Sequence, residues 1–263
     1  HLHSGTSRGK TTMLSVAASV TGGEMGSWRT TDNALEAIAE RHNDNCLLLD
    51  EISQCDPDAV AQVAYMLANG KGKSRSTKTG GSRRISEWNL VFLSTGEESI
   101  RERADQGYRN KSMPGHEVRV ISLRADGGTE HGVFTAIPDD MAANELADKL
   151  KKERGKYYGT PLISFIEKIK IQPDLLATEA FRSRMAFLDT YGHLNLKAHT
   201  LRVAGHFSFL AGVGEFAIKH EILPWSAGDA LKAVKFCFDQ WLSDNNNGND
   251  LIIQKSIEKL ISL

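Results

Sequence analysis

Short apolar runs alternate with amphipathic stretches over the first half of the chain. Continuous apolar runs at 46–49 and 90–93 are typical of strands that are covered on both faces, and 118–123 predicts a further strand. Helical spacing between the runs predicts helices over 11–20, 32–42 and 56–67. Strands that alternate with helices indicate an α/β fold built on a parallel sheet that is flanked by helices. Asp32 and Asp56, the latter followed by Pro57, are the expected N-caps of the second and third helices.

The pattern becomes mainly helical after residue 125. A connector is expected at 126–138, and it is followed by helical patterns over 139–154, 162–169, 174–191, 197–220, 226–243 and 250–263. The sequence therefore predicts a core domain over 1–125 and a helical C-terminal domain over 139–263. Because the first glycine-rich turn follows so soon after His1, we expect the chain to be a fragment of a longer protein.

The main candidate site is a glycine-rich turn that leads into the first predicted helix: Ser4, Gly5, Thr6, Ser7, Arg8, Gly9, Lys10, Thr11 and Thr12. It matches the phosphate-loop pattern G-x-x-x-x-G-K-[ST], except that serine replaces the first glycine. Backbone N–H groups of residues 5–12 and the positive end of the helix are expected to bind ATP. Lys10 would reach the β- and γ-phosphates, and Thr11 would offer its hydroxyl to Mg²⁺. A chance glycine-rich turn is the alternative.

Two further groups support a nucleotide site. The apolar run at 46–49 ends in Asp50 and Glu51, which is the Walker B arrangement. Asp50 is expected to orient the hydration shell of Mg²⁺, and Glu51 to polarise the attacking water. The alternative is that the two carboxylates only cap the structure that follows. After the next strand, Thr95 is the first choice and Ser94 the second for a polar group on the γ-phosphate or the lytic water.

An arginine that stabilises charge on the transferred phosphoryl group is also expected. Arg119 begins the strand predicted after Thr95, where oligomeric ATPases place an arginine that reaches the nucleotide of the neighbouring subunit. Arg101, Arg103 and Arg109 remain alternatives.

Positive charge is concentrated in one segment, although the net charge of the chain is only −1. The stretch from 70 to 86 has no acidic residue and contains Lys71, Lys73, Arg75, Lys78, Arg83 and Arg84. Gly80 and Gly81 at its centre predict a β-hairpin over 70–88 with a two-residue turn. Like charges would face each other beside this turn, and they destabilise a hairpin unless an anion lies between them. We therefore expect the hairpin to bind the phosphate backbone of single-stranded DNA. A solvated surface loop is the alternative.

Composition excludes several other classes of protein. A chain of 263 residues with 40% hydrophobic and 25% charged residues is typical of a globular protein that folds without disulfides or structural metal. No apolar run approaches the roughly 20 residues of a membrane helix. Cys46, Cys55 and Cys237 lack metal-ligand spacing, as is typical of the reducing cytoplasm. We therefore expect a cytoplasmic protein without a membrane partner.

With these motifs assembled, the chain resembles the bacterial and phage family known as domain of unknown function 927. The resemblance rests on SRGKTT (7–12), SWRTTDNAL (27–35), LLDEI (48–52), YMLANG (65–70), LSTGE (93–97), EVR (117–119), RVA (202–204), GE (214–215) and Trp225. Ser4 departs from the glycine that this family's loop usually has. The resemblance implies an ATPase carried by phages, plasmids and integrated elements, and commonly joined to a primase-like region. Its motif order is similar to that of hexameric AAA+ and superfamily-3 helicases, in which a hairpin before the strand that corresponds to 90–93 grips single-stranded DNA.

These observations favour an ATP-driven DNA helicase or translocase that forms a hexameric ring and serves replication of a mobile genetic element. One alternative is an AAA+ ATPase that remodels a protein partner. A second is a nucleotide-dependent DNA-binding scaffold that hydrolyses ATP only weakly, although a scaffold has no need of Glu51.

Overall fold

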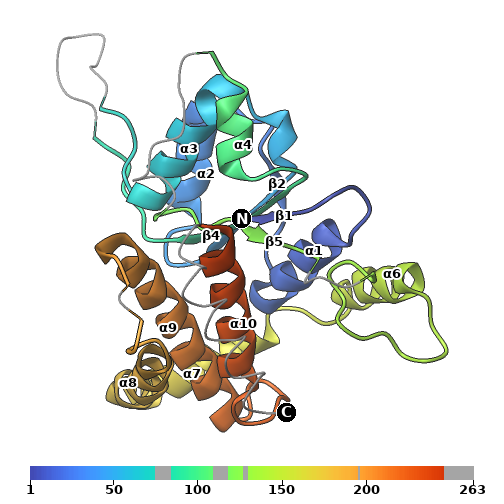
Figure 1. Cartoon of the computed structure of the whole chain (residues 1–263), viewed down its shortest axis with the longest axis vertical. Coiled ribbons are helices and arrows are strands. Elements are labelled where there is room, and N and C mark those ends of the chain that lie inside the picture. The colour runs from blue at the N-terminus through green and yellow to red at the C-terminus, as the bar shows by residue number, and fades with distance from the viewer. Residues whose placement is uncertain (75–83, 109–117, 127–129, 195, 246–263) are drawn as a thin grey trace. The chain divides into compact units, whose positions relative to one another are not determined.

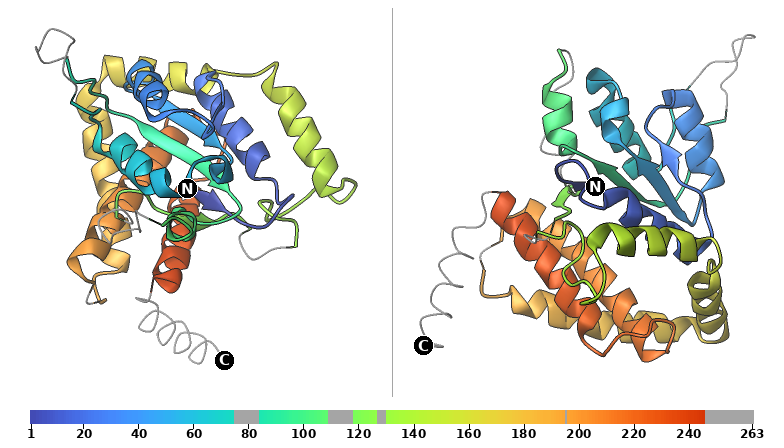
Figure 2. Two further views of the ribbon diagram at one scale, coloured as in Figure 1. Left: turned by 90° about the horizontal axis from the view of Figure 1, so that it is seen from above. Right: turned by 90° about the vertical axis from the view of Figure 1, so that its right-hand side faces the viewer.

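The computed structural model describes residues 1–74, 84–108, 118–126, 130–194 and 196–245 (Figure 1). The chain divides into two compact units, His1–Thr160 and Pro161–Leu263. The first unit contains the sheet, and the described elements of the second unit are all helices. The unit boundary thus follows helix α6 (Ala143–Arg154), which belongs with the sheet and lies beside α1 (Lys10–Thr21) (Figures 1 and 2).

A five-stranded parallel sheet forms the centre of the first unit. Its spatial order is β2-β3-β4-β1-β5, and its strands are β1 (Leu2–His3), β2 (Gly26–Ser27), β3 (Cys46–Asp50), β4 (Val91–Gly96) and β5 (Leu123–Arg124). Parallel neighbours require crossover connections, and helices supply them here. The predicted α/β fold with a parallel sheet is therefore confirmed.

Helices cover both faces of this sheet. The alternation of side chains along β3 divides them between two cores. Leu47 and Leu49 pack in the core that includes α2 (Asp32–Arg41) and α3 (Pro57–Asn69), whereas Leu48 packs with Leu14 and Ala18 of α1. A strand that is buried on both faces is continuously apolar, which explains why the run at 46–49 could be recognised from sequence.

The starts of α2 and α3 test the predicted caps. The Asp56 side chain accepts a hydrogen bond from the backbone N–H of Asp58 at 3.0 Å, and Pro57 is the first helical residue, as predicted. At α2 the prediction was wrong, because Thr31 is the N-cap and its hydroxyl oxygen accepts the N–H of Ala34 at 3.4 Å. Asp32 is the first helical residue, where its negative charge still favours the helix N-terminus.

The predicted strand over 118–123 is formed only at its end. β5 pairs with β1, but residues 118–120 lie in a turn that buries Val120 in the core. The short helix α4 (Ile100–Asp105) was not predicted, because six residues hold little periodic signal. Its start is defined by a capping box between Ser99 and Glu102.

The second unit consists of α7 (Thr160–Ile171), α8 (Pro173–Thr190), α9 (Ala198–Lys219) and α10 (Asp229–Asp244), close to four of the predicted helical ranges. Its core is rich in aromatic residues: Phe187, Tyr191, Phe207, Phe238 and Trp241. The predicted helix over 250–263 lies outside the described residues. None of the described helices is long and apolar enough to cross a membrane.

Candidate active site

Polar side chains meet where β1, β3 and β4 end. Because β4 lies between β1 and β3, Thr95 near its end is placed between the glycine-rich loop and Asp50. The Thr95 hydroxyl donates a hydrogen bond to Asp50 Oδ1 and accepts the backbone N–H of Glu51 at 3.3 Å. Thr11 Oγ1 donates to the same Asp50 oxygen at 3.4 Å. Asp50 thus joins the first turn of α1 to the end of β4.

The loop itself requires glycine at position 9. Gly9 has φ of 87°, in the left-handed region, and it caps the N-terminus of α1. A Cβ at this position would lie 2.7 Å from Cγ2 of Val133, so the position also lacks space for a side chain. Close backbone approach at this point is what a phosphate-binding loop needs.

Serine at position 4 is compatible with the conformation of the loop. Ser4 does not have a positive φ, whereas Ser7 and Gly9 do. Ser4 is buried, and its backbone N–H donates to the Gly96 carbonyl at 3.3 Å. The departure from the usual glycine therefore introduces no backbone strain.

Lys10 is buried inside the loop. Its Nζ donates hydrogen bonds to the carbonyl oxygens of Ser4 and Gly5, at 2.7 and 2.8 Å. The ammonium group is thereby placed at the centre of the loop, where it could exchange carbonyl oxygens for phosphate oxygens.

Residues 130–134 of the predicted connector lie against this loop. The Val133 N–H donates to the Arg8 carbonyl at 2.9 Å, and Arg8 Nη1 donates to the Glu130 carbonyl at 3.2 Å. Gly132 has φ of 67°, and a Cβ there would collide with the same Arg8 carbonyl. This part of the site was missed from sequence, where a glycine in a polar stretch was its only signal.

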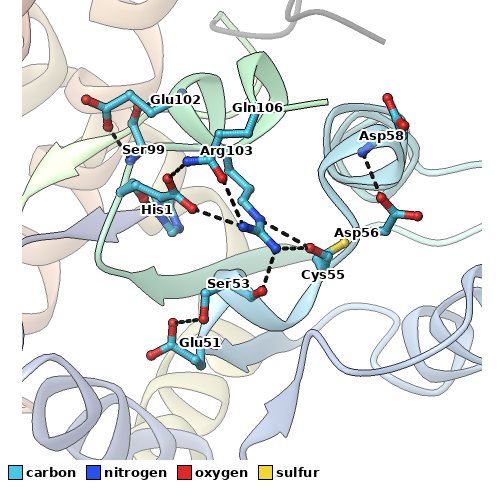
Figure 3. A network of polar contacts seen from close by, with 11 residues as sticks. His1, Glu51, Ser53, Cys55, Asp56, Asp58, Ser99, Glu102, Arg103 and Gln106 are labelled. Atoms are coloured by element: carbon cyan, nitrogen blue, oxygen red, sulfur yellow. Dashed lines mark hydrogen bonds and ion pairs between the residues drawn. The ribbon is translucent and has the colours of Figure 1, made fainter. Parts of the chain in front are cut away.

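Glu51 has an unusual backbone conformation for a non-glycine residue. Its φ is 60° and its ψ is 81°, and it begins the short 3₁₀ turn η1 (Ile52–Gln54). A left-handed conformation costs a residue with a Cβ roughly 1–2 kcal/mol, so surrounding contacts must hold it. The Ser53 hydroxyl donates to Glu51 Oε1 at 2.6 Å (Figure 3).

Ser94 and Thr95, the two candidates for a polar group on the γ-phosphate or the lytic water, have different surroundings at the end of β4. Ser94 is fully buried; its hydroxyl accepts the indole N–H of Trp28 at 3.1 Å and lies 2.7 Å from Nδ1 of His1. Thr95 is the one that reaches Asp50 and Glu51.

The arginines that are candidates for stabilising charge on the transferred phosphoryl group also differ in their contacts. Arg119 lies over the ring of Tyr65 in α3, with its guanidinium carbon 5.0 Å from the ring centroid, which is within the range of a cation–π contact. Arg101 forms an exposed ion pair with Asp105 at 3.8 Å. Arg109 lies outside the described residues. Arg103 is bound to backbone carbonyls of its own chain (Figure 3).

The two described ends of the basic segment run antiparallel. The Gly72 N–H donates to the Ser86 carbonyl at 2.9 Å, and the Trp88 N–H donates to the Gly70 carbonyl at 3.0 Å. The Trp88 side chain is buried, and its indole N–H donates to the Leu67 carbonyl. The segment is therefore anchored on α3 at its base.

Some of the basic charge in this segment is already paired. Lys71 forms an ion pair with Glu87 at 2.9 Å, and Lys73 forms one with Asp32 at 2.7 Å. Arg84 is exposed. Outside the described residues lie Arg75, Lys78 and Arg83, together with the predicted turn at 80–81.

A magnesium ion at this site would depend on few protein ligands. In the described part of the chain, no three His, Cys, Asp or Glu side chains are grouped closely enough to hold a metal. A Thr11 hydroxyl beside the Asp50 carboxylate fits Mg²⁺, which keeps several waters and takes phosphate oxygens as its other ligands.

Cys55 is a poor nucleophile, because burial and the nearby Asp32 raise the pKa of its thiol to about 11.

Comparison with known proteins agrees with this fold. Residues 1–87 match the family model of a domain of unknown function, DUF927. A solved structure described as SCCmec type IV Cch, an active helicase, superposes with a TM-score of 0.65 at 19% sequence identity. The match covers 98% of this chain and 46% of that one, so this chain spans less than half the length of that helicase. At this identity the similarity shows a shared fold.

Proposed function

We propose that this protein is an ATP-driven DNA helicase or translocase with a P-loop ATPase site of the AAA+ type. The observation that carries the proposal is the meeting of Thr11, Asp50, Glu51 and Thr95 beside the loop that encloses Lys10. Fold similarity to a protein described as an active helicase supports it.

The geometry supports the following roles for the loop residues and Asp50. Lys10 would transfer its hydrogen bonds from the Ser4 and Gly5 carbonyls to the β- and γ-phosphates of ATP, while loop N–H groups bind the phosphate oxygens. Thr11 and Asp50 would hold Mg²⁺, which neutralises charge on the phosphates when it is bound.

Glu51 and Thr95 would act on the attacking water. Glu51 would accept its proton, because its carboxylate directly follows Asp50, the proposed ligand of Mg²⁺, at the end of β3. The Thr95 hydroxyl, which bridges Asp50 and the Glu51 backbone, would bond the γ-phosphate or the attacking water itself.

The remaining roles depend on assembly and DNA. In a hexameric ring, Arg119 of one subunit would complete the site of the next. The basic segment at 70–88 would contact the phosphate backbone of single-stranded DNA. We further propose that the protein acts in the replication of a mobile element and lies in the cytoplasm. A primase-like region on the N-terminal side would be joined to it.

Steady-state ATP hydrolysis, measured with and without single-stranded DNA, tests the proposal. Hydrolysis should rise with DNA and be lost in Glu51→Gln, which removes the proposed base but keeps the size of the side chain. Lys78→Glu should abolish stimulation by DNA and keep the basal rate. Absence of hydrolysis from an assembled protein would contradict the proposal.

A second candidate is an AAA+ ATPase that remodels a protein partner. It is favoured by the ion pairs of Lys71 and Lys73, which reduce the charge available for DNA at the base of the segment. Hydrolysis that requires Glu51 but is unaffected by DNA would support this candidate.

A further inference from the structure

Arg103 of α4 binds the turn that follows Glu51 (Figure 3). Its Nη2 donates to the carbonyl oxygens of Ser53 and Cys55, at 2.6 and 2.7 Å, and its Nε also donates to Cys55 at 3.2 Å. Only 16% of its side chain is exposed. Hydrogen bonds from a charged donor in a protected position are stronger than those between neutral groups.

This turn has few hydrogen bonds of its own. The Gln54 N–H donates to the Glu51 carbonyl at 3.2 Å, and the Cys55 N–H donates to the Ile52 carbonyl at 2.9 Å. The Ser53 and Cys55 carbonyls point instead at Arg103. Because Glu51 has a left-handed backbone, the turn needs outside support to keep that conformation.

The other side of the Arg103 guanidinium is bound to the segment that follows β4. Its Nη1 donates to Gln106 Oε1 at 3.1 Å and lies 3.5 Å from Glu98 Oε1. The capping box fixes the start of α4 directly after β4, which carries Thr95. Arg103 therefore ties the segment that follows Thr95 to the segment that follows Glu51.

A second contact joins the same two segments. Ile52 is completely buried, and a Cβ on Gly96 would collide with its side chain. The end of β4 thus packs tightly on the start of the turn. Arg103 holds the far end of the turn, so that both of its ends are fixed relative to β4.

We propose that Arg103 is a positioning residue for ATP hydrolysis, which keeps the Glu51 carboxylate in register with Thr95 and does not touch the nucleotide. The inference rests on the proposed function and adds a residue to its machinery. Arginine is suited to this role because its planar guanidinium presents five N–H donors, enough for two backbone carbonyls and two side-chain oxygens at once. Lysine has three donors on a compact ammonium group.

Kinetics of Arg103→Ala and Arg103→Lys test the proposal. A reacting group displaced by about 1 Å costs on the order of 100-fold in rate, so kcat should fall by about that factor in Arg103→Ala while nucleotide affinity stays unchanged. Arg103→Lys should lie between Arg103→Ala and the native protein. Arg41→Ala, which removes an exposed arginine at the end of α2, is the matched control and should hydrolyse ATP normally.

A double variant separates positioning from general stability. Glu51→Gln, although inactive in the steady state, should keep a slow residual rate in single turnovers. If Arg103 acts through Glu51, then adding Arg103→Ala should not lower that residual rate further. Losses that multiply would show that the two residues act independently, and they would overturn the proposal.

Hydrogen–deuterium exchange provides a readout that does not depend on hydrolysis. The Gln54 and Cys55 amides should exchange faster in Arg103→Ala than in the native protein, while the amides of α1 keep their native exchange rates. Equal exchange would refute the inference. Faster exchange in a protein that hydrolyses no ATP would instead refute the proposed function and leave the anchoring of the turn established. If the alanine variant does not fold, Arg103→Lys serves the same comparison.

Discussion

Backbone conformation at single residues separates the positions of the loop that need glycine from those that do not. Gly9 combines a positive φ with a contact that a Cβ would violate, whereas Gly5 has open space around it and no positive φ. Two glycines of one motif therefore differ in their tolerance of substitution.

We predict that Gly9→Ala lowers the free energy of unfolding by at least about 1 kcal/mol, since a left-handed backbone alone costs a residue with a Cβ that much. Urea denaturation of the intact chain measures the change. Gly5→Ala is the control and should leave the unfolding free energy unaltered. Equal losses in both variants would contradict the assigned conformation.

Thr95 offers a second prediction at this scale. Thr95→Val keeps the shape of the side chain but removes the hydroxyl that bridges Asp50 and Glu51. We expect kcat for ATP hydrolysis to fall by about 10- to 100-fold, as is usual when a residue that hydrogen-bonds a metal ligand is lost. Thr95→Ser retains the hydroxyl and should remain active. A fully active valine variant would show that this hydroxyl has no part in hydrolysis.

Contacts between elements explain why the connector matters. Residues 130–134 are distant in sequence from the loop, but they bind both the backbone and the side chain of Arg8. The loop conformation thus depends on a segment that follows β5.

Gly132→Ala should weaken nucleotide binding, because the added Cβ collides with the Arg8 carbonyl and pushes the connector off the loop. Isothermal titration with a non-hydrolysable nucleotide measures the effect. Gly155→Ala introduces the same methyl group at the end of α6, where φ is −67° and the nearest atom lies 3.4 Å away. That variant should bind nucleotide normally, and equal weakening in both would exclude the connector.

The ion pairs that join Glu179 of α8 to Lys219 and His220 at the end of α9 should make the free energy of unfolding depend on pH. A hydrogen bond from Lys219, and then one from His220 at 2.8 Å, lower the pKa of the Glu179 carboxyl below its ordinary value of 4.5. A lowered folded-state pKa means that the stabilisation is fully present above the unfolded pKa and is lost as pH falls through the folded value. Thermal unfolding should therefore show Glu179→Gln to be less stable than the native chain at pH 6, with the difference vanishing at strongly acidic pH. A difference that persists there would exclude ionisation as the cause.

At the scale of the whole molecule, the proposed ring places Lys10 and Arg119 of one active site on different subunits. Lys10→Ala and Arg119→Ala should each abolish hydrolysis. Mixing the two variants should restore part of the activity, because some interfaces then pair an intact Lys10 with an intact Arg119. The measurement is the ATPase rate as a function of mixing ratio. A mixture as inactive as its components would contradict a shared site.

The features that could be predicted from the sequence are those that depend on short stretches of neighbouring residues. The apolar run of β3, the Asp56 cap and the glycine–lysine pair of the loop each depend on neighbours within a few residues, and all three are found in the structure. The choice of Thr31 over Asp32 as the α2 cap was missed, because both residue types favour that position. β1 and β2 have two residues each, too few for a period to be recognised, and β5 overlaps the predicted strand over 118–123 only at Leu123.

The sequence by itself determined which chemical groups the loop and the end of β3 offer. The loop motif and the Asp50–Glu51 pair are each a continuous stretch of residues, so a local reading of the sequence is enough to find them. Only the tertiary structure decided that Thr95 rather than Ser94 reaches Asp50, that Arg103 supports the turn after Glu51, and that residues 130–134 cover the loop. These arrangements follow from the placing of β4 between β1 and β3 and from contacts between residues far apart in sequence. Such contacts depend on the packing of the whole sheet and helix layers, for which no short stretch of sequence carries a signal.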